Sequence, residues 1–186
     1  RGWDGSQPVM LNDVEKRSQR IVSRGPLRTI VEVKDKGWTI LPNGTPIDMT
    51  TLYTLYAGQR ACDVSATFNR DAEEYDFATG FINVKNSTEF SDGNGLRGCW
   101  GTDWPVSAKD SVGHKRETVG LGIFIPNKHI KKEVSADKHN YAFVVGAKGN
   151  SLNYSITFCS DNESFGYHND KDWYNYLKEW KQKKLH

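Results

Sequence analysis

The chain has 186 residues, of which 37% are hydrophobic and 26% are charged, so it can bury the core of one large domain and keep a polar surface. Its formal net charge of +2 excludes the strongly basic surface of a nucleic-acid-binding protein. No apolar run approaches the ~20 residues that a membrane-spanning helix needs. We therefore expect no nucleic-acid partner and no membrane span.

The first segment, residues 1–19, is polar and contains Gly2, Gly5 and Pro8, which favour turns and loops. The sequence begins with arginine rather than methionine. We interpret residues 1–19 as a loop that continues from a missing upstream region. The domain itself is expected to span residues 20–186 and to pack on that upstream region.

Short segments with strand character follow one another along the chain. Residues 27–34 alternate with a period of two, which is typical of a strand with one buried face. Gly58-Gln59 and Gly149-Asn150 each separate two such segments and predict hairpins. The predicted strands are residues 20–23, 27–34, 48–57, 61–68, 77–84, 118–125, 141–147 and 153–159. This series of strands and turns predicts a mainly β protein, an antiparallel β-sandwich.

One amphipathic helix is predicted at the C-terminal end, at about residues 169–183, with Asp170 as its cap. Aromatic and apolar side chains recur in it at i, i+3, i+4 and i+7, and they are Trp173, Tyr176, Leu177 and Trp180. Such a stripe is typical of a helix that packs on a core, so we assign it to packing rather than to ligand binding. The lysines that follow suit the negative end of the helix dipole, and they are Lys181, Lys183 and Lys184.

The three cysteines are Cys62, Cys99 and Cys159, and no two of them have the C-x-x-C spacing of a zinc site. Their odd number argues against a complete disulfide framework. We expect three buried free thiols, with one disulfide and one free thiol as the alternative. The sequence predicts no metal and no other cofactor.

The segment 86–114 differs from the rest because it is rich in Gly, Asp, Asn and Ser, which predicts a long irregular loop. Trp100 and Trp104 lie four residues apart within it. An indole can pack on the apolar face of a pyranose ring while Arg97 and Asp103 bond its hydroxyl groups. The segment therefore predicts a sugar-binding platform. The alternative is that both tryptophans close the edge of the sandwich beneath a loop.

Candidates for proton transfer lie in two places. His114 stands close to Arg116 before a predicted strand, and a histidine near neutral pKa can act as a general acid or base. The alternative is an exposed loop histidine. Tyr56 and Arg60 flank a hairpin turn, where the arginine can neutralise a uronic-acid carboxylate and the phenol can relay a proton in β-elimination. The alternative for this pair is an ordinary cross-strand contact.

Motifs that would name a reaction do not occur in the sequence. There is no G-x-S-x-G elbow, P-loop, H-E-x-x-H motif or dinucleotide-binding fingerprint. No carboxylate pair for glycoside hydrolysis can be selected, because a sequence does not give the separation between carboxylates. Three further histidines lie in polar loops and are expected to face solvent, and they are His129, His139 and His168.

Several runs of residues resemble a family of domains of unknown function that occurs in Bacteroides-type bacteria beside polysaccharide-degradation genes. They are RIVSRGPLRTIVEV at 20–33, YAGQR at 56–60, FATG at 77–80, VGLGI at 119–123 and WYNYL at 173–177. The resemblance implies that the chain is the C-terminal half of a larger bacterial protein that is periplasmic or secreted. It also implies a fold similar to the galactose-mutarotase-like supersandwich. The resemblance supplies no catalytic residues.

Together these observations predict a carbohydrate-active protein of a polysaccharide-utilisation system, a lyase- or glycosidase-type enzyme whose partner is an acidic oligo- or polysaccharide. The alternatives are a non-catalytic carbohydrate-binding module and a structural β-sandwich domain that packs on a partner region. The predicted site residues are Tyr56 and His114 for proton transfer, Arg60, Arg97 and Arg116 for carboxylate recognition, and Trp100, Asp103 and Trp104 for contacts with the sugar ring.

Overall fold

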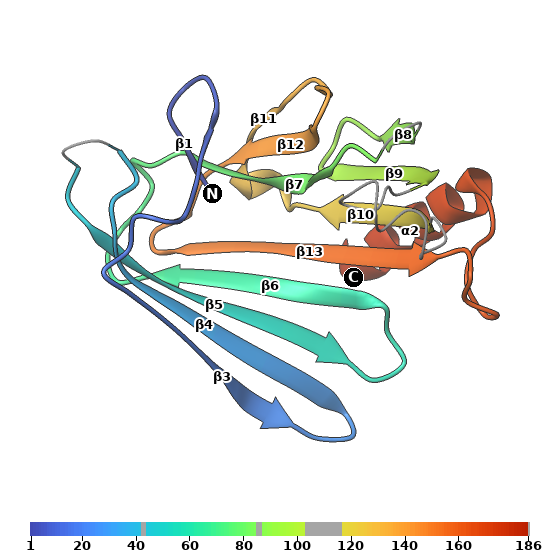
Figure 1. The fold of residues 1–186 in the computed structure, drawn as a ribbon, viewed down its shortest axis with the longest axis horizontal. Helices are drawn as coiled ribbons and strands as arrows, with labels where there is room; N and C mark the ends of the chain where they lie inside the picture. The colour runs from blue at the N-terminus through green and yellow to red at the C-terminus, as the bar shows by residue number, and fades with distance from the viewer. Residues whose placement is uncertain (42–43, 85–86, 103–116, 186) are drawn as a thin grey trace, which may run out of the picture.

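The computed structural model describes residues 1–41, 44–84, 87–102 and 117–185, and it folds them into two antiparallel sheets and one long helix (Figure 1). The smaller sheet has five strands in the order β11-β12-β7-β1-β2. Its strands are β1 (Gly2–Trp3), β2 (Pro8–Val9), β7 (Phe77–Ile82), β11 (Ile130–Glu133) and β12 (Asn140–Val145).

The larger sheet has eight strands in the order β3-β4-β5-β6-β13-β10-β9-β8. They are β3 (Lys16–Arg24), β4 (Arg28–Trp38), β5 (Ile47–Tyr56), β6 (Ala61–Phe68), β8 (Thr88–Ser91), β9 (Leu96–Thr102), β10 (Thr118–Phe124) and β13 (Ser151–Ser160). A short 3-10 helix, η1 (Asn127–His129), precedes β11, and the helix α2 (Asp170–Leu185) follows β13. The predicted antiparallel β-sandwich with one C-terminal helix is confirmed.

Strand β13 lies in the middle of the larger sheet although it is the last strand of the chain. It pairs with β6 on one side and with β10 on the other. The four strands β3 to β6 follow one another as neighbours on the first side, and β8 to β10 do the same on the second. Figure 1 shows β3 to β6 fanning away from the five-stranded sheet, while β9 and β10 lie close to it.

The core lies between the two sheets. Trp38 and Ile123 from the larger sheet and Phe77 and Phe143 from the smaller one are all at most 3% exposed. Phe77 also stacks on Phe68, with ring centroids 4.8 Å apart. Each fully buried side chain of this size stabilises the fold by about 1.5–3 kcal/mol, which explains why the two sheets stay together here.

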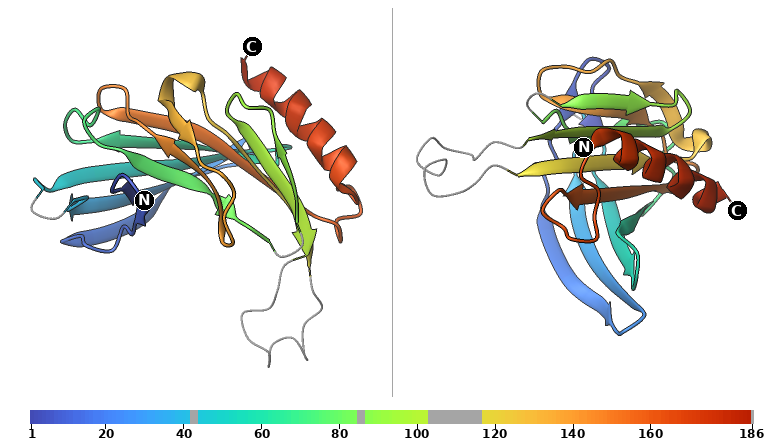
Figure 2. Two further views of the ribbon diagram at one scale, coloured as in Figure 1. Left: turned by 90° about the horizontal axis from the view of Figure 1, so that it is seen from above. Right: turned by 90° about the vertical axis from the view of Figure 1, so that its right-hand side faces the viewer.

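The helix α2 packs on the outer face of the larger sheet, over β9 and β10 (Figure 2). Three glycines of these strands make room for it. A Cβ added at Gly98 or Gly122 would lie 2.3 or 2.5 Å from Leu177, and one at Gly120 would lie 2.7 Å from Trp173. The glycines therefore give α2 a flat floor, and the predicted packing stripe is confirmed for Trp173, Leu177 and Trp180, which are all at most 5% exposed.

The beginning of α2 differs slightly from the prediction. Asn169, rather than Asp170, caps the helix, because its side-chain oxygen accepts the backbone N–H of Asp172 at 2.9 Å. The helix ends at Leu185 instead of residue 183. Among the described residues, no helix is both long and apolar enough to cross a membrane.

Two segments predicted as loops contain strands. The expected loop 1–19 holds β1, β2 and the start of β3. The side chains of β3 are exposed along almost its whole length, and a strand that buries neither face shows no apolar alternation in its sequence. The expected irregular segment 86–114 contains β8 and β9, which form a hairpin. Its glycines were interpreted as loop residues, whereas Gly98 provides space for α2.

His129 is buried, so the expectation that it faces solvent is wrong. Its side chain is 1% exposed, and its Nδ1 lies 3.0 Å from the carbonyl oxygen of Gly146. Its Nε2 accepts the backbone N–H of Asn153 at 3.4 Å. These contacts require a neutral imidazole with its proton on Nδ1, and burial lowers the pKa of His129 from its ordinary value of 6.5.

This lowered pKa predicts a stability that decreases in mild acid. The unfolded chain takes up a proton at the ordinary histidine pKa, whereas the folded chain resists protonation of His129 to a lower pH. The stabilisation is therefore complete above about pH 6.5 and is lost as the pH falls below it. We expect urea denaturation between pH 7.5 and 5 to show this decrease, and His129→Asn to remove part of it. His139→Asn, at an exposed position, should keep the wild-type dependence of the free energy of unfolding on pH. The same dependence in His129→Asn would contradict the lowered pKa of His129.

Candidate functional site

The predicted site residues that the structure describes do not form one cluster. Four of them, Asp103, Trp104, His114 and Arg116, lie outside the described residues. The strand ends on either side of that segment are paired, since Thr102 and Thr118 are cross-strand partners with their Oγ1 atoms 3.1 Å apart. The other four predicted residues lie in three separate environments.

Arg97 lies inside the sandwich and does not face a ligand surface. Its side chain is 2% exposed, and its Nη2 lies 2.5 Å from Oε1 of Glu89. Its Nη1 donates to the backbone carbonyls of Val134 and Ala142 at 2.7 and 3.0 Å, and its guanidinium lies 5.1 Å from the ring centroid of Tyr141. Arg97 therefore connects the two sheets, and its burial favours a structural role over the predicted role in carboxylate recognition.

Trp100 lies on a strand and not in a loop. It is half-buried and packs against the cluster that α2 forms with the larger sheet. Its cross-strand partners are Gly120 and Thr88, which places it on the outer face beneath the helix. This arrangement corresponds to the packing alternative for Trp100, in which an indole closes an edge of the sandwich.

Tyr56 and Arg60 lie at the hairpin turn between β5 and β6, as predicted. The turn is closed by the backbone N–H of Gln59, which donates to the carbonyl of Tyr56 at 3.2 Å, and Gly58 adopts a φ of 72° in it, which favours glycine. Tyr56 is 42% exposed at the end of β5. Arg60 extends across the sheet end and donates to the carbonyl of Phe158 at 3.1 Å.

Arg60 is held by one carboxylate and one aromatic ring. Its Nη1 donates to Oε2 of Glu163 at 2.8 Å, and both side chains keep about a fifth of their surface exposed, at 20% and 22%. The guanidinium carbon lies 5.4 Å from the ring centroid of Tyr167. The ion pair fixes the direction of the guanidinium, which leaves its remaining N–H groups available on the exposed side.

A hollow of about 430 Å³ opens between this turn and α2, and we call it the Arg60 hollow. It is lined by Gly58, Gln59, Arg60, Tyr167, Tyr176, Trp180, Lys183 and Lys184. It thus combines three cationic side chains with three aromatic ones. Tyr56 is not part of the lining. Of the predicted site residues that the structure describes, only Arg60 contributes to it.

The aromatic wall of the Arg60 hollow is ordered by ring packing. The ring centroids of Tyr167 and Tyr176 are 5.1 Å apart, and Tyr176 in turn stacks on Trp173 at 5.2 Å. Burial raises the pKa of both tyrosine phenols, so both remain protonated at neutral pH. Each can donate a hydrogen bond to a ligand oxygen while its ring offers an apolar surface.

The cationic wall comes from the last turns of α2. Lys183 is exposed, and Lys184 forms an ion pair with Asp63. Trp180, one turn earlier, is 5% exposed, and its indole Nε1 has no hydrogen-bond partner within the described part of the chain. The wall thus has one exposed cation, Lys183, and a buried indole N–H of Trp180 that has no acceptor among the described residues.

The sequence did not identify most of the residues that line the Arg60 hollow, because most of them already had another predicted role. Tyr176 was assigned to the packing stripe, and Lys183 and Lys184 to the helix dipole. The spacing alone indicates that three of these side chains are neighbours. Lys183 and Lys184 follow Tyr176 by seven and eight residues, so they lie on the same side of a helix. Tyr167 precedes the helix and belongs to no periodic pattern in the sequence that would have indicated its place.

A second, smaller hollow of about 280 Å³ adjoins the first and shares Tyr167 and Tyr176 with it. Its remaining lining is Gly166, His168, Asp172, Asn175 and Glu179. The tyrosine pair therefore stands between a cationic hollow and a hollow with carboxylate and amide groups.

The three cysteines are free thiols in separate positions of the sandwich. Cys62, Cys99 and Cys159 are all free thiols, and Cys62 is half-buried rather than buried. Burial raises the pKa of Cys99 to about 12 and that of Cys159 to about 11, so both thiols are unreactive near neutral pH. Within residues 1–41, 44–84, 87–102 and 117–185, no three His, Cys, Asp or Glu side chains converge as metal ligands would.

The chain was compared with protein families, with curated proteins and with solved structures. No curated protein and no solved structure matches it. A family described as a domain of unknown function, DUF4861, matches residues 1–186. The predicted kinship with a family of this kind is thereby confirmed in its general form. The match covers the sandwich, the helix and the Arg60 hollow alike, and the chain belongs to the DUF4861 family.

Proposed function

We propose that this protein is a carbohydrate-binding member of a bacterial polysaccharide-degradation system, periplasmic or secreted, and that the Arg60 hollow holds a uronic-acid residue of an acidic glycan. The observation that carries the proposal is the meeting of Arg60, Lys183 and the Tyr167–Tyr176 pair in one hollow. A uronic acid has a carboxylate that suits the cations and an apolar ring face that suits the tyrosines.

The dimensions and charge of the hollow support binding of a sugar unit. Its volume of about 430 Å³ lies within the range of roughly 300–1,000 Å³ that small-ligand sites occupy. Lys183 and the exposed side of Arg60 can bind a carboxylate without losing an existing partner, because the carboxylate of Glu163 occupies only one side of the guanidinium.

The first test compares two forms of one ligand. Oligogalacturonides should bind, and the same oligosaccharides with methyl-esterified carboxyl groups should bind much more weakly, in isothermal titration calorimetry at low salt. Lys183→Gln removes one charge-assisted contact and should weaken binding of the acidic form about tenfold, which corresponds to about 1.4 kcal/mol. Binding of the esterified form should not change.

Lys171→Gln is the matched control, because it removes the same charge from the same helix at its exposed first turn, far from the Arg60 hollow. It should leave the affinity unchanged. Equal weakening by both substitutions would indicate a general effect of net charge and would contradict the site. Equal affinity for the acidic and the esterified ligand would contradict the uronic-acid assignment.

A lyase- or glycosidase-type activity is the second candidate, and one chain of contacts favours it. Glu163 pairs with Arg60 and accepts the backbone N–H of Ser160 at 3.2 Å, and the Oγ of Ser160 donates to Glu117 at 3.0 Å. Glu117 directly follows the segment with His114 and Arg116 in the sequence. Absorbance of unsaturated uronate or new reducing ends in the calorimetry samples would establish catalysis. Binding without either product would establish a non-catalytic module.

A further inference from the structure

A hollow with apolar walls lies beside the Arg60 hollow, and we call it the Phe158 hollow. It has a volume of about 630 Å³. Leu55 and Ile156 line it at 44% and 37% exposure, and Phe158 and Phe165 line it at 63% and 82% exposure. Contiguous apolar surface that is open to water marks a binding site in many soluble proteins.

The Phe158 hollow and the Arg60 hollow lie on opposite faces of the eight-stranded sheet. Successive side chains of a strand alternate between the two faces. Asp63 is on the face that α2 covers, because it pairs with Lys184. Its neighbour Cys62 is therefore on the inner face, together with its cross-strand partners Leu55 and Ile156.

The two hollows meet at the turn between β5 and β6. Gly58, Gln59 and Arg60 line both of them. A Cβ placed at Gly58 would meet no atom within 4 Å, so the space beside this turn is open. A ligand that is bound at Arg60 can therefore extend around the end of the sheet from one hollow into the other.

The two hollows differ in charge. In the Phe158 hollow, Arg60 is balanced by Glu163, to which it donates at 2.8 Å, and both side chains are part of the lining. The Arg60 hollow adds the exposed cation Lys183. An acidic group is therefore better placed in the Arg60 hollow, and an uncharged apolar group in the Phe158 hollow. The exposed rings of Phe158 and Phe165 favour an aromatic group, because aromatic rings pack well on one another.

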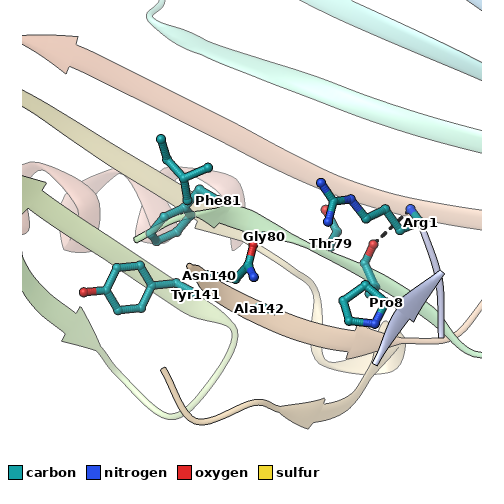
Figure 3. Close-up of a pocket in the computed structure, with 10 residues that line it drawn as sticks. Arg1, Pro8, Thr79, Gly80, Phe81, Asn140, Tyr141 and Ala142 are labelled. Carbon is teal, nitrogen blue, oxygen red and sulfur yellow. Dashed lines mark hydrogen bonds between the residues drawn. The ribbon is translucent and has the colours of Figure 1, made fainter. Parts of the chain in front are cut away.

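The sizes of the hollows point the same way. The Phe158 hollow lies within the range of roughly 300–1,000 Å³ that small-ligand sites occupy. Figure 3 shows another hollow, between Arg1 and Pro8 on one side and the β7–β12 pair on the other, and its volume of about 210 Å³ is below that range. Ile82 lines this smaller hollow and supplies a control position below.

We propose that the Phe158 hollow receives an aromatic group that is joined to the acidic sugar in the Arg60 hollow, as an ester of a ring hydroxyl group or as an aryl glycoside. This inference rests on the proposed function, because Arg60 holds the sugar carboxylate. Arg60 also donates to the backbone carbonyl of Phe158 at 3.1 Å, which keeps the guanidinium beside the apolar hollow. The preferred ligand is thus an acidic glycan with an aromatic substituent.

Calorimetry with three forms of one oligogalacturonide tests this preference. They are the methyl glycoside, the 4-nitrophenyl glycoside and a benzoate ester of the methyl glycoside. At least one aromatic form should bind about tenfold more tightly than the methyl glycoside, because its ring is removed from water. The form that shows the gain identifies the position of the aromatic group.

Phe158→Ala should bring the affinity ratio of the aromatic form to the methyl glycoside close to one, because the aromatic group loses its contact. The substitution retains the backbone carbonyl that Arg60 bonds. Ile82→Ala is the control, because it removes an apolar side chain that is 54% exposed and lines the hollow of Figure 3 instead. It should keep the wild-type ratio.

Alkylation of Cys62 locates the aromatic group, because this residue lines the Phe158 hollow. Cys62 is half-buried, whereas Cys99 and Cys159 are buried, so iodoacetamide should modify Cys62 first. Burial raises the pKa of Cys62, and the reaction is therefore followed by mass spectrometry at about pH 8.5. Saturation with the aromatic form should slow it about tenfold, whereas the methyl glycoside should slow it little.

The outcomes separate this inference from the proposed function. Equal affinity for the methyl glycoside and both aromatic forms would overturn the inference and leave the proposed function intact. Absence of binding by all three forms would overturn both. 4-Nitrophenyl β-D-glucoside has the ring without the carboxylate and should protect Cys62 poorly. Equal protection by this neutral compound would overturn the inference, because the aromatic group would then bind independently of the acidic sugar.

Discussion

Replacing Arg97 with alanine is expected to lower the free energy of unfolding by about 3–5 kcal/mol, the usual cost of removing one partner from a buried ion pair. The guanidinium lies between the sheets at 2% exposure and is paired with Glu89. It also satisfies the carbonyls of Val134 and Ala142. Alanine leaves these acceptors without donors in a space that the larger side chain filled.

Urea denaturation at pH 7 measures this loss, and Arg20→Ala is its control. Arg20 pairs with Glu32, but its side chain is 66% exposed, and ion pairs of that kind contribute about 0–1 kcal/mol. If Arg97 instead served a ligand, Arg97→Ala would unfold at nearly the wild-type urea concentration and would lose affinity only. A cost below about 1 kcal/mol would therefore contradict the structural role assigned to Arg97.

Trp173→Ala is the second substitution with a large expected effect, at about 3–5 kcal/mol. Trp173 is fully buried, lies above Gly120 and donates from its Nε1 to the carbonyl of Leu121 at 3.2 Å. The sheet beneath it has Gly120 in place of a larger side chain, so that strand offers no side chain to fill the cavity. Loss of Trp173 also removes the stacking partner of Tyr176.

Circular dichroism and urea denaturation of Trp173→Ala measure both the global stability and the docking of α2. Phe165→Ala is the matched aromatic control, since Phe165 is 82% exposed and substitutions at such positions usually change stability by less than about 0.5 kcal/mol. A Trp173→Ala variant as stable as Phe165→Ala would show that α2 contributes little to the fold.

The fold class could be predicted because its signals are local. Alternation in residues 27–34 and the stripe of Trp173 and Trp180 each report one buried face. The sheet to which a strand belongs could not be predicted in the same way. Gly149-Asn150 suggested a hairpin, but β12 belongs to the five-stranded sheet and β13 to the eight-stranded sheet. Turn residues permit a reversal of the chain without determining which strands then pair.

The candidate site was harder to predict because it depends on tertiary contacts. Arg60 was selected for carboxylate recognition from its place beside a hairpin turn, and it lines the Arg60 hollow. Its neighbours Tyr167 and Lys183 come from more than a hundred residues later in the chain. Arg97 was selected for its charge in a segment rich in glycine. Gly98 in that segment makes room for the helix, and the arginine points to the opposite side of the strand, into the core.

The central place of β13 in the larger sheet has a consequence for how the protein folds. The ribosome releases β3 to β6 first and β8 to β10 later, and each group can form hairpins from neighbouring strands. The two groups have no shared edge until residues 151–160 are made and insert between β6 and β10. Pairings of such large sequence separation close slowly. Completion of the whole sheet is therefore expected to follow the synthesis of β13, when this last strand joins two preformed halves.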